Sequence, residues 1–560
     1  MNKEKRKMKQ TMKHQSLFSG IKSLGIMLSL GLTLASCTMD DVAQDPAKPN
    51  EEENKDLTTF VAGGENKTRT SMDYNSGDFY WEAGDYIYVK DDNGVLRKSK
   101  NAPTSKVASF NYKVPGKFTA KTSYKVYYLG KNSSGNSVTI STAQKQTAPN
   151  ITAHFDTAGD YGMAKANKVT GKNQFEFVLE HHPAYLVFQP YTSNTILQNC
   201  YLTKVEVSSD NDIVAKYTVN LTTDTLDASA VSNGKQIVLK TQDTSSSSSY
   251  YNGFPLTNNS ASVTTNGAYM VIKPGTHTLK VRYWVKDVVT GTEGTITKTY
   301  PSTTYASNTY YDVTADLNVR DYDGDHYYMW DAQEQYWKGH EWNHGGSQPT
   351  LNNDLPNATK SSDYAKNNSD SRYYHEGGGS VRFDATQSCA TLPNANELSW
   401  YCMYGDPRWD ADELWTTMGH LYKGGMWFKK KSVLLAEGHY DTEKSADGST
   451  DLRTIWKSYD NYSRSITNSG LPSSADAGNY FYLPALGWYL FGQLSFVGNS
   501  GFYWSSSAQL RKAYIDPSTL IAYPRGYGAY YLYFGSGRVD VFRSPLDSKH
   551  NEGYRVGGFE

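Results

Sequence analysis

The sequence has few cysteines and no excess of charge of one sign. Only four cysteines occur among its 560 residues: Cys37, Cys200, Cys389 and Cys402. So few thiols do not staple a chain of this length, and because none lies in a Cys-x-x-Cys pair, no zinc motif is present. The 56 basic and 57 acidic residues give a formal net charge of -1. This balance argues against nucleic acid as a partner.

Motifs of catalysis are also missing. No Gly-x-Ser-x-Gly elbow, phosphate loop or His-Glu-x-x-His stands where strand and helix context would support it. Glycoside hydrolysis needs two opposed carboxylates. Asp410, Asp412 and Glu413 are instead close together in the sequence. They lie at an expected helix N-terminus, where the helix dipole favours acidic side chains. We therefore predict no enzyme, no catalytic residue and no cofactor, and keep a carbohydrate-active enzyme as a remote alternative.

The N-terminus reads as an export signal. Basic residues between positions 3 and 13 precede an apolar run, 24–35, that is too short to cross a bilayer. The run ends in Leu34-Ala35-Ser36-Cys37, which resembles the lipobox of bacterial lipoproteins. This resemblance implies cleavage before Cys37 and acylation of that residue, and the alternative is a plain secretory signal. Acidic residues after Cys37 resemble surface-export signals of Bacteroides-type bacteria, and the polar composition of 37–57 indicates a flexible tether.

From residue 57 to about 318 the pattern indicates β-structure. Short segments alternate apolar and polar residues, are rich in aromatic and β-branched types, and are divided by Gly, Asn, Ser and Pro, which is typical of sandwiches. We predict strands within the ranges 79–90, 123–129, 174–188, 202–207 and 277–285.

Two motifs in this region carry a resemblance. Thr68-Arg69-Thr70 is followed by Trp81-Glu82-Ala83-Gly84-Asp85-Tyr86-Ile87, and the stretch 175–188 has a strand–His–Ala–strand pattern. In this order they resemble fimbrillin-like proteins. The resemblance implies two Greek-key β-sandwiches, association with other pilus subunits, and Arg69 as a conceivable processing site. His181 and His182 we interpret as a polar strand end and not as a metal site.

Beyond residue 321 the composition changes, with ten of the 12 tryptophans after Tyr327. Asp321 to Asp325 is similar to a calcium loop, but Ala332 stands where a bidentate Glu is needed, so we expect an interdomain turn. The ranges 394–400 and 411–421 are the expected helices, the first with a capping box and the second with an apolar face at 3.6 spacing. Cys389 and Cys402 flank the first helix, and either a disulfide or two buried thiols fits their spacing.

The last 80 residues carry a second resemblance. Their order is Leu483-Pro484-Ala485, then Gly501-Phe502-Tyr503-Trp504-Ser505-Ser506, then Ala529 to Phe534, and Gly553 to Val556 near the end. This order resembles C-type-lectin-like domains of bacterial surface proteins, including receptors varied by diversity-generating retroelements. The final Val556-Gly557-Gly558 departs from the family's ending. A calcium-dependent sugar site is not expected, because no Glu-Pro-Asn or Gln-Pro-Asp run is present.

Strand alternation in the same stretch predicts a binding face. Tyr530, Leu532 and Phe534 fall on one side of a strand, and a turn at 535–537 leads into a return strand with Val539 and Val541 facing the core. The opposite side is rich in Tyr and Arg, as interface hot spots are. Alternatively, these tyrosines only coat a Tyr-rich sheet. The predicted ligand-binding residues are Arg511, Lys512, Tyr514, Tyr523, Arg525, Tyr527, Tyr531, Tyr533, Arg538, Asp540 and Phe542.

Together these patterns predict a mainly β chain with a C-terminal α+β domain. The expected divisions are a signal peptide, a tether, a fimbrillin-like sandwich, a second sandwich and a lectin-like domain, at 1–36, 37–57, 58–190, 191–320 and 326–560. The predicted function is a lipid-anchored outer-membrane adhesin or pilus-tip protein that binds an extracellular protein or glycan. The alternative is a structural pilus subunit or anchor without a ligand of its own.

Overall fold

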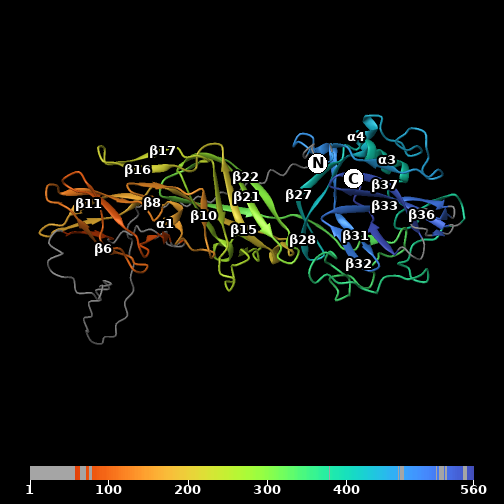
Figure 1. The fold of residues 1–560 in the computed structure, drawn as a ribbon, viewed down its shortest axis with the longest axis horizontal. Helices are drawn as coiled ribbons and strands as arrows, with labels where there is room; N and C mark the ends of the chain where they lie inside the picture. The colour runs from red at the N-terminus through yellow and green to blue at the C-terminus, as the bar shows by residue number, and fades with distance from the viewer. Residues whose placement is uncertain are drawn as a thin grey trace, which may run out of the picture. The chain divides into compact units, whose positions relative to one another are not determined.

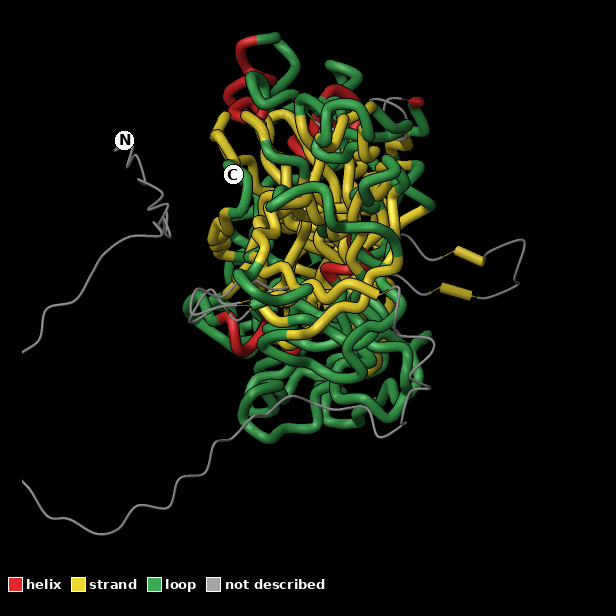
Figure 2. The backbone as a smooth tube through the Cα atoms, turned by 90° about the vertical axis from the view of Figure 1, so that its left-hand side faces the viewer, coloured by secondary structure: helices red, strands yellow, loops and turns green. Residues whose placement is uncertain are grey.

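A computed structural model shows a mainly β protein with several sheets and few, short helices (Figure 1 and Figure 2). Cys37, the signal peptide, the tether and Arg69 lie outside the residues that it describes. None of the helices in the described part of the chain is both long and apolar enough to cross a membrane. The described residues are 57–63, 71–72, 74, 79–377, 379–464, 466, 472–511, 514–515, 522–523, 526–546 and 551–560.

The chain folds as two compact units. The first consists of Met1–Ser193, Tyr201–Val285 and Ile296–Leu317, and the second of Asn194–Cys200, Lys286–Thr295 and Asn318–Glu560. The last passage from one to the other falls between Leu317 and Asn318, close to the change of composition seen in the sequence.

The first unit contains an eight-stranded sheet in the order β5-β4-β7-β11-β12-β1-β6, with β13 paired to β11. Its other sheets have six, four, three and two strands. The strands of the eight-stranded sheet are β1 (Leu57–Ala62), β4 (Ile87–Lys90), β5 (Leu96–Lys98), β6 (Phe110–Pro115), β7 (Ser123–Tyr128), β11 (Gly162–Lys168), β12 (Gln174–Phe177) and β13 (Glu180–His181).

The six-stranded sheet runs β10-β18-β15-β21-β22 with β19 beside β15, and the smaller sheets run β17-β16-β9-β8, β20-β14-β23 and β2-β3. Two single-turn helices, α1 (Phe155–Ala158) and α2 (Val263–Asn266), complete this unit. The strands are β10 (Ala143–Lys145), β15 (Tyr201–Ser209), β18 (Gln236–Lys240), β19 (Phe254–Pro255), β21 (Gly275–Lys286), β22 (Glu293–Tyr305), β8 (Ser133–Ser134), β9 (Ser137–Thr139), β16 (Lys216–Asn220), β17 (Thr225–Ser229), β14 (Ala184–Tyr191), β20 (Ala268–Ile272), β23 (Thr309–Asp316), β2 (Ser71–Met72) and β3 (Phe79–Tyr80).

Strands from both sides of residue 190 pair in the same sheets. β9 pairs with β16 and β10 pairs with β18, each across that position. β14, which ends at Tyr191, lies between β20 and β23. The expected division at 190/191 therefore does not separate the sheets of this unit.

The Trp–Gly–Asp motif builds the core of the eight-stranded sheet. Trp81 is fully buried, and Asp85 is buried where it accepts hydrogen bonds from the Glu82 N–H at 2.7 Å and the Tyr128 hydroxyl at 3.0 Å. Along β4 the predicted alternation is confirmed, with Ile87 and Val89 inside. The buried Asp85 carboxylate therefore has hydrogen-bond donors at the turn before the strand.

His181 is not a polar strand end, so that interpretation is wrong. Its side chain is fully buried, with Nδ1 2.8 Å from Oδ2 of Asp160, and Tyr185 donates to the other oxygen of that carboxylate at 2.7 Å. A buried polar cluster of this kind is stable only when its members pair with one another.

The second unit has a nine-stranded sheet in the order β25-β38-β31-β33-β36-β37-β29, with β26 paired to β33 and β32 paired to β31. A four-stranded sheet runs β24-β27-β28-β30, and β34 pairs with β35. Its strands are β24 (Arg320–Tyr322), β25 (Tyr327–Tyr328), β26 (Arg382–Asp384), β27 (Arg408–Thr417), β28 (His420–Lys429), β29 (Tyr459–Asn461), β30 (Tyr480–Pro484), β31 (Leu486–Leu490), β32 (Gln493–Val497), β33 (Ser500–Arg511), β34 (Tyr514–Ile515), β35 (Ala522–Tyr523), β36 (Gly526–Gly535), β37 (Arg538–Leu546) and β38 (Glu552–Arg555).

One of the two expected helices of this unit is present. Helix α3 (Ala395–Tyr404) begins after Asn394, whose side chain accepts from the Glu397 N–H while the Glu397 carboxylate accepts from the Asn394 N–H. The capping box predicted from the sequence is thus confirmed. α3 packs its Leu398 and Cys402 into a core that includes Val539 and Val541 of β37. The remaining helices are α4 (Lys431–Ala436), η1 (Leu197–Asn199) and η2 (Ala477–Asn479).

The helix predicted over 411–421 is wrong, because this segment is the β27–β28 hairpin. Met418 and Gly419 have φ of 45° and 83° and form its two-residue turn, in which Thr417 pairs with His420. Positive φ at both turn positions matches the twist of paired strands, and glycine adopts it without strain. The apolar residues spaced as on a helix are buried because both faces of the hairpin are covered.

Candidate functional site

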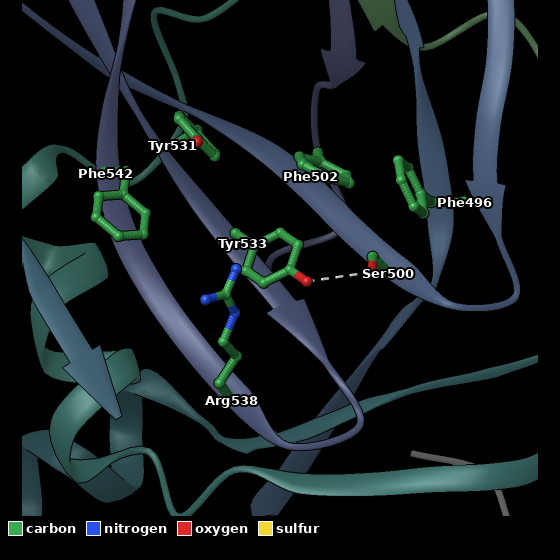
Figure 3. Close-up of a pocket in the computed structure, with 7 residues that line it drawn as sticks. All are labelled: Phe496, Ser500, Phe502, Tyr531, Tyr533, Arg538 and Phe542. Carbon is green, nitrogen blue, oxygen red and sulfur yellow. Dashed lines mark hydrogen bonds between the residues drawn. The ribbon is translucent and has the colours of Figure 1, made fainter. Parts of the chain in front are cut away.

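Four predicted residues of the second unit meet in one pocket, Tyr531 and Tyr533 on β36 and Arg538 and Phe542 on β37. The cavity has a volume of about 270 Å³. Figure 3 shows the aromatic rings around it and the Arg538 guanidinium beside the Tyr533 ring. Its lining residues are Phe496, Ser500, Phe502, Tyr531, Tyr533, Arg538 and Phe542.

Strand register brings these side chains to one face of the sheet. Tyr531 pairs with Phe542, and Tyr533 pairs with Phe502 of β33. Residues directly opposite each other in antiparallel strands project to the same side. Tyr530 and Leu532 alternate with them and are fully buried. The alternation predicted from the sequence is therefore confirmed, and the turn at 536–537 joins the two strands as expected.

The rings of the pocket pack against one another and leave one side open. Phe502 lies 5.0 Å from Tyr533 and 6.3 Å from Tyr531, measured between ring centroids, and is nearly parallel to the latter. Tyr531 also lies 5.0 Å from Tyr554, so burial raises the pKa of its hydroxyl. Phe496 at the rim is 44% exposed. The site combines a rigid aromatic floor with an accessible edge.

Arg538 is the one charged residue in the lining. Its Nε lies 3.1 Å from Oδ2 of Asp540, NH1 donates to the Tyr462 hydroxyl at 3.3 Å, and its Cζ lies 4.7 Å above the centre of the Tyr533 ring. Stacking on an aromatic face and pairing with a carboxylate fix the plane of the guanidinium.

Asp540 is not on the exposed surface, which corrects its predicted role. It is fully buried, because β37 continues the sheet to β29, where Asp460 pairs with it. Burial raises the pKa of Asp540 to about 6, with the Asp460 carboxylate adding to the rise and Arg538 opposing it. Asp540 therefore forms an ion pair with Arg538 on its buried side and cannot contact a ligand directly.

The predicted position of Tyr527 at the binding face is also wrong. It lies in β36 rather than in an irregular segment, and it is buried. Its hydroxyl accepts from the Gly379 N–H at 2.5 Å and donates to the Ser380 carbonyl at 3.0 Å. Tyr527 thus fastens a neighbouring loop and does not line the pocket.

For the other predicted contact residues the structure describes at most the strand in which they lie. Arg511 ends β33, and Tyr514 of β34 pairs with Tyr523 of β35. Lys512 and Arg525 lie outside the described residues. Their roles stay predictions.

Three pocket residues were missed by the sequence analysis: Phe496, Ser500 and Phe502. Phe502 alternates correctly along β33, so a prediction that β33 pairs with β36 would have found it. Ser500 shares a hydrogen bond of 3.4 Å with the Tyr533 hydroxyl. Phe496 reaches the rim with φ of 63°, a left-handed conformation that no sequence signal marks.

The two cysteines beside α3 are free thiols, which corrects the disulfide alternative. Cys389 accepts a hydrogen bond from the Asp331 N–H, while the Cys402 thiol donates to the Val539 carbonyl. They belong to different core clusters. Burial raises the pKa of both thiols, so neither is a reactive thiolate.

The adjacent acids 410–413 form no catalytic pair of opposed groups. Asp410 is buried at a bulge of β27, where Oδ1 accepts from the N–H groups of Asp412 and Glu413 and Oδ2 accepts from Trp427 Nε1. It caps backbone groups as predicted, but in a strand bulge and not at a helix. Its carboxylate is used structurally.

A His-Glu-x-x-His order does occur at 340–344, but without the helix that such a zinc site needs. The segment is a series of turns, and His340 Nδ1 lies 3.7 Å from Asp363 while His344 Nδ1 lies 4.0 Å from Glu341. Among the residues that the structure describes, no cluster of three or more His, Cys, Asp or Glu could hold a metal ion.

No family model matches the sequence, and no curated protein matches it. Solved structures give weak likenesses. A candidate cell adhesion protein from Bacteroides ovatus has 13% identity and a TM-score of 0.28, covering 46% of this chain and 93% of its own. The fimbrial anchor protein Mfa2 from Porphyromonas gingivalis has 12% identity and a TM-score of 0.21, covering 43% and 82%.

A fimbrial protein from Bacteroides ovatus spans more, 89% of this chain and 98% of its own, at 9% identity and a TM-score of 0.21. TM-scores this low assign no function. Over about half of its length, the chain resembles cell adhesion and fimbrial proteins of Bacteroides and Porphyromonas.

Proposed function

We propose that this protein is a cell-surface binding protein that captures an extracellular ligand in the aromatic–arginine pocket of its second unit. The observation that carries the proposal is the pocket itself, in which five aromatic rings and one arginine surround a cavity of about 270 Å³. Aromatic residues and arginine dominate the energetics of recognition sites. Four of these residues were expected at a binding face from strand alternation alone.

The position of Phe496 supports a role in binding. A non-glycine residue with φ of 63° has a conformational free-energy cost of about 1 kcal/mol. Phe496 adopts this conformation, and its ring is 44% exposed at the rim of the pocket. A half-exposed ring contributes little to folding. Phe491 has a similar backbone and a similarly exposed ring away from the pocket, so it is the place of the Phe496 ring at the pocket rim, and not its strain, that supports contact with a ligand.

Attachment to the cell is proposed from the sequence. The lipobox-like Leu34-Ala35-Ser36-Cys37 supports a lipid on Cys37 and a place on the outer surface. The Gly-Phe-Tyr-Trp-Ser-Ser order from Gly501 supports a C-type-lectin-like fold for the second unit, open to retroelement diversification. The fimbrillin-like motifs support association of the first unit with pilus subunits.

The test compares two matched phenylalanines. Phe496 and Phe491 both have positive φ, 63° and 49°, and are 44% and 37% exposed, but only Phe496 lines the pocket. Full-length wild-type protein and the variants Phe496→Gly and Phe491→Gly are applied to an array of glycans and host proteins. We expect wild type and Phe491→Gly to give the same bound spots and Phe496→Gly to lose them.

Glycine relieves the backbone strain in both variants, so unfolding should change little in either and loss of binding cannot be blamed on folding. Retention of the spots by Phe496→Gly would contradict the pocket assignment. Absence of any bound spot for wild type would favour a structural pilus subunit, and release of cleaved glycan would favour an enzyme.

A further inference from the structure

Arg538 presents an unused edge to the pocket. Of its five N–H groups, Nε faces Asp540 and one on NH1 donates to Tyr462. The Tyr533 hydroxyl also interacts with the guanidinium, and the described residues show no carboxylate or carbonyl hydrogen-bonded to Nη2. The side chain is 43% exposed, and Figure 3 shows the guanidinium at the pocket between the Tyr533 and Phe542 rings. A planar guanidinium with a free edge matches a carboxylate.

The rest of the lining consists of flat aromatic rings with few hydroxyl groups. Phe502 and Tyr531 lie 23° from parallel with centroids 6.3 Å apart, which makes a shelf of two rings. Polar groups beside it are the hydroxyls of Ser500 and Tyr533, joined at 3.4 Å. The volume of about 270 Å³ is large enough for one small ring.

From this geometry we infer that the pocket binds an acidic sugar, with the pyranose ring on the aromatic shelf and the sugar carboxylate on the free edge of Arg538. The inference rests on the proposed function and names its ligand class. The C–H face of a pyranose packs on aromatic rings, and its hydroxyls can exchange hydrogen bonds with Ser500 and Tyr533.

Neutral sugars and apolar peptide side chains fit the same lining less well. A neutral sugar offers Arg538 only hydroxyl and ether oxygens, which form weaker hydrogen bonds with a guanidinium than a carboxylate does. An aromatic peptide side chain would cover the shelf but leave the Ser500 and Tyr533 hydroxyls unused. The acidic sugar satisfies the shelf, the hydroxyls and the charge together.

Asp540 is the positioning residue for this site. It touches Arg538 from the buried side, and the titratable or charged groups near it are Asp460 on β29, Tyr531 and Tyr533 on β36, and Cys402 on α3. Its negative charge offsets that of Arg538. An amide in its place would have nearly the same size but no negative charge, so the full positive charge of Arg538 would act on the ligand.

The experiment uses the full-length protein at pH 7.5 and two pairs of probes followed by ligand-observed NMR titration. Methyl glucuronide is compared with methyl glucoside, and a methyl sialoside is compared with its reduced, uncharged form. We expect at least one acid to bind about tenfold more tightly than its neutral partner. Arg538→Gln should remove this preference, and Asp540→Asn should strengthen acid binding several-fold without changing neutral binding.

Equal affinity of acids and neutral partners would overturn the inference, as would a preference that survives Arg538→Gln. Binding of an aromatic peptide with no sugar bound would overturn it too. In that case the array result for Phe496→Gly still decides the proposed function, because that comparison does not depend on ligand class. The Asp540→Asn response separates positioning from folding, since a misfolded variant would lose acid and neutral binding alike.

Discussion

At the scale of single residues, the pocket shows what alternation along a strand can and cannot predict. Tyr531, Tyr533 and Phe542 project where a period of two places them. Asp540 follows the same period, but it is fully buried beside β29, where it pairs with Asp460 from a segment 80 positions earlier in the sequence. Alternation gives the face of a residue and not what covers that face.

The buried Asp540 makes stability depend on pH. Burial raises its pKa from 3.8 to about 6 in the folded protein. Between about pH 4 and 6 the folded protein keeps a proton that the unfolded chain has released, so the free energy of unfolding falls as pH rises through this window. Asp540→Asn does not titrate. Relative to this variant, wild type should lose about 1–3 kcal/mol between pH 4 and pH 7, at about 1.4 kcal/mol per pKa unit.

Urea denaturation of both proteins at several pH values measures this difference, and carboxylates that do not interact with Asp540 cancel because both proteins share them. A difference that stays constant from pH 4 to pH 7 would show that Asp540 has an ordinary pKa. A difference that moves in the opposite direction would mean that Arg538 outweighs burial.

At the scale of elements, the capping signal at 394–397 predicted a helix correctly, and the helical spacing over 411–421 did not. The Asn394–Glu397 capping box names two specific hydrogen bonds, and both form. The apolar spacing over 411–421 fits a helix, and it fits equally well a hairpin with both faces buried. The Met418–Gly419 turn decides for the hairpin, and its signal is the glycine.

The cap of α3 can be tested separately. Asn394→Ala removes the acceptor for the Glu397 N–H, which is 3.0 Å from Asn394 Oδ1, and should lower the free energy of unfolding by about 1 kcal/mol. Asn394→Gly should lower it by only a few tenths of that amount. Chemical denaturation of the two variants makes the comparison. Equal losses would mean that the side-chain bond to the Thr442 carbonyl matters more than the cap.

At the scale of the whole molecule, the class of fold is readable from composition, but the arrangement of strands is not. Turn residues and alternating segments indicate a mainly β chain throughout. The sheets that join β9 with β16 and β10 with β18 depend on contacts between distant segments. The local sequence does not indicate those contacts, so it predicted a domain boundary at residue 190.

The proposed lipid on Cys37 predicts where the protein is found in the cell. Cys37→Ala removes the acceptor of the lipid, and each buried methylene of an acyl chain contributes about 0.8 kcal/mol to membrane attachment. The variant should move from the membrane fraction to the soluble fraction and should not take up labelled palmitate. Continued membrane attachment of an unlabelled variant would contradict the lipoprotein assignment.

The central claim is that the aromatic–arginine pocket binds the ligand. Its most direct measurement is the Kd of the full-length protein for the strongest array ligand, determined by titration calorimetry for wild type, Phe496→Gly and Phe491→Gly. We expect Phe496→Gly to weaken binding at least about tenfold, or 1.4 kcal/mol, and Phe491→Gly to leave it within about twofold. Equal affinities for the two variants would contradict the claim.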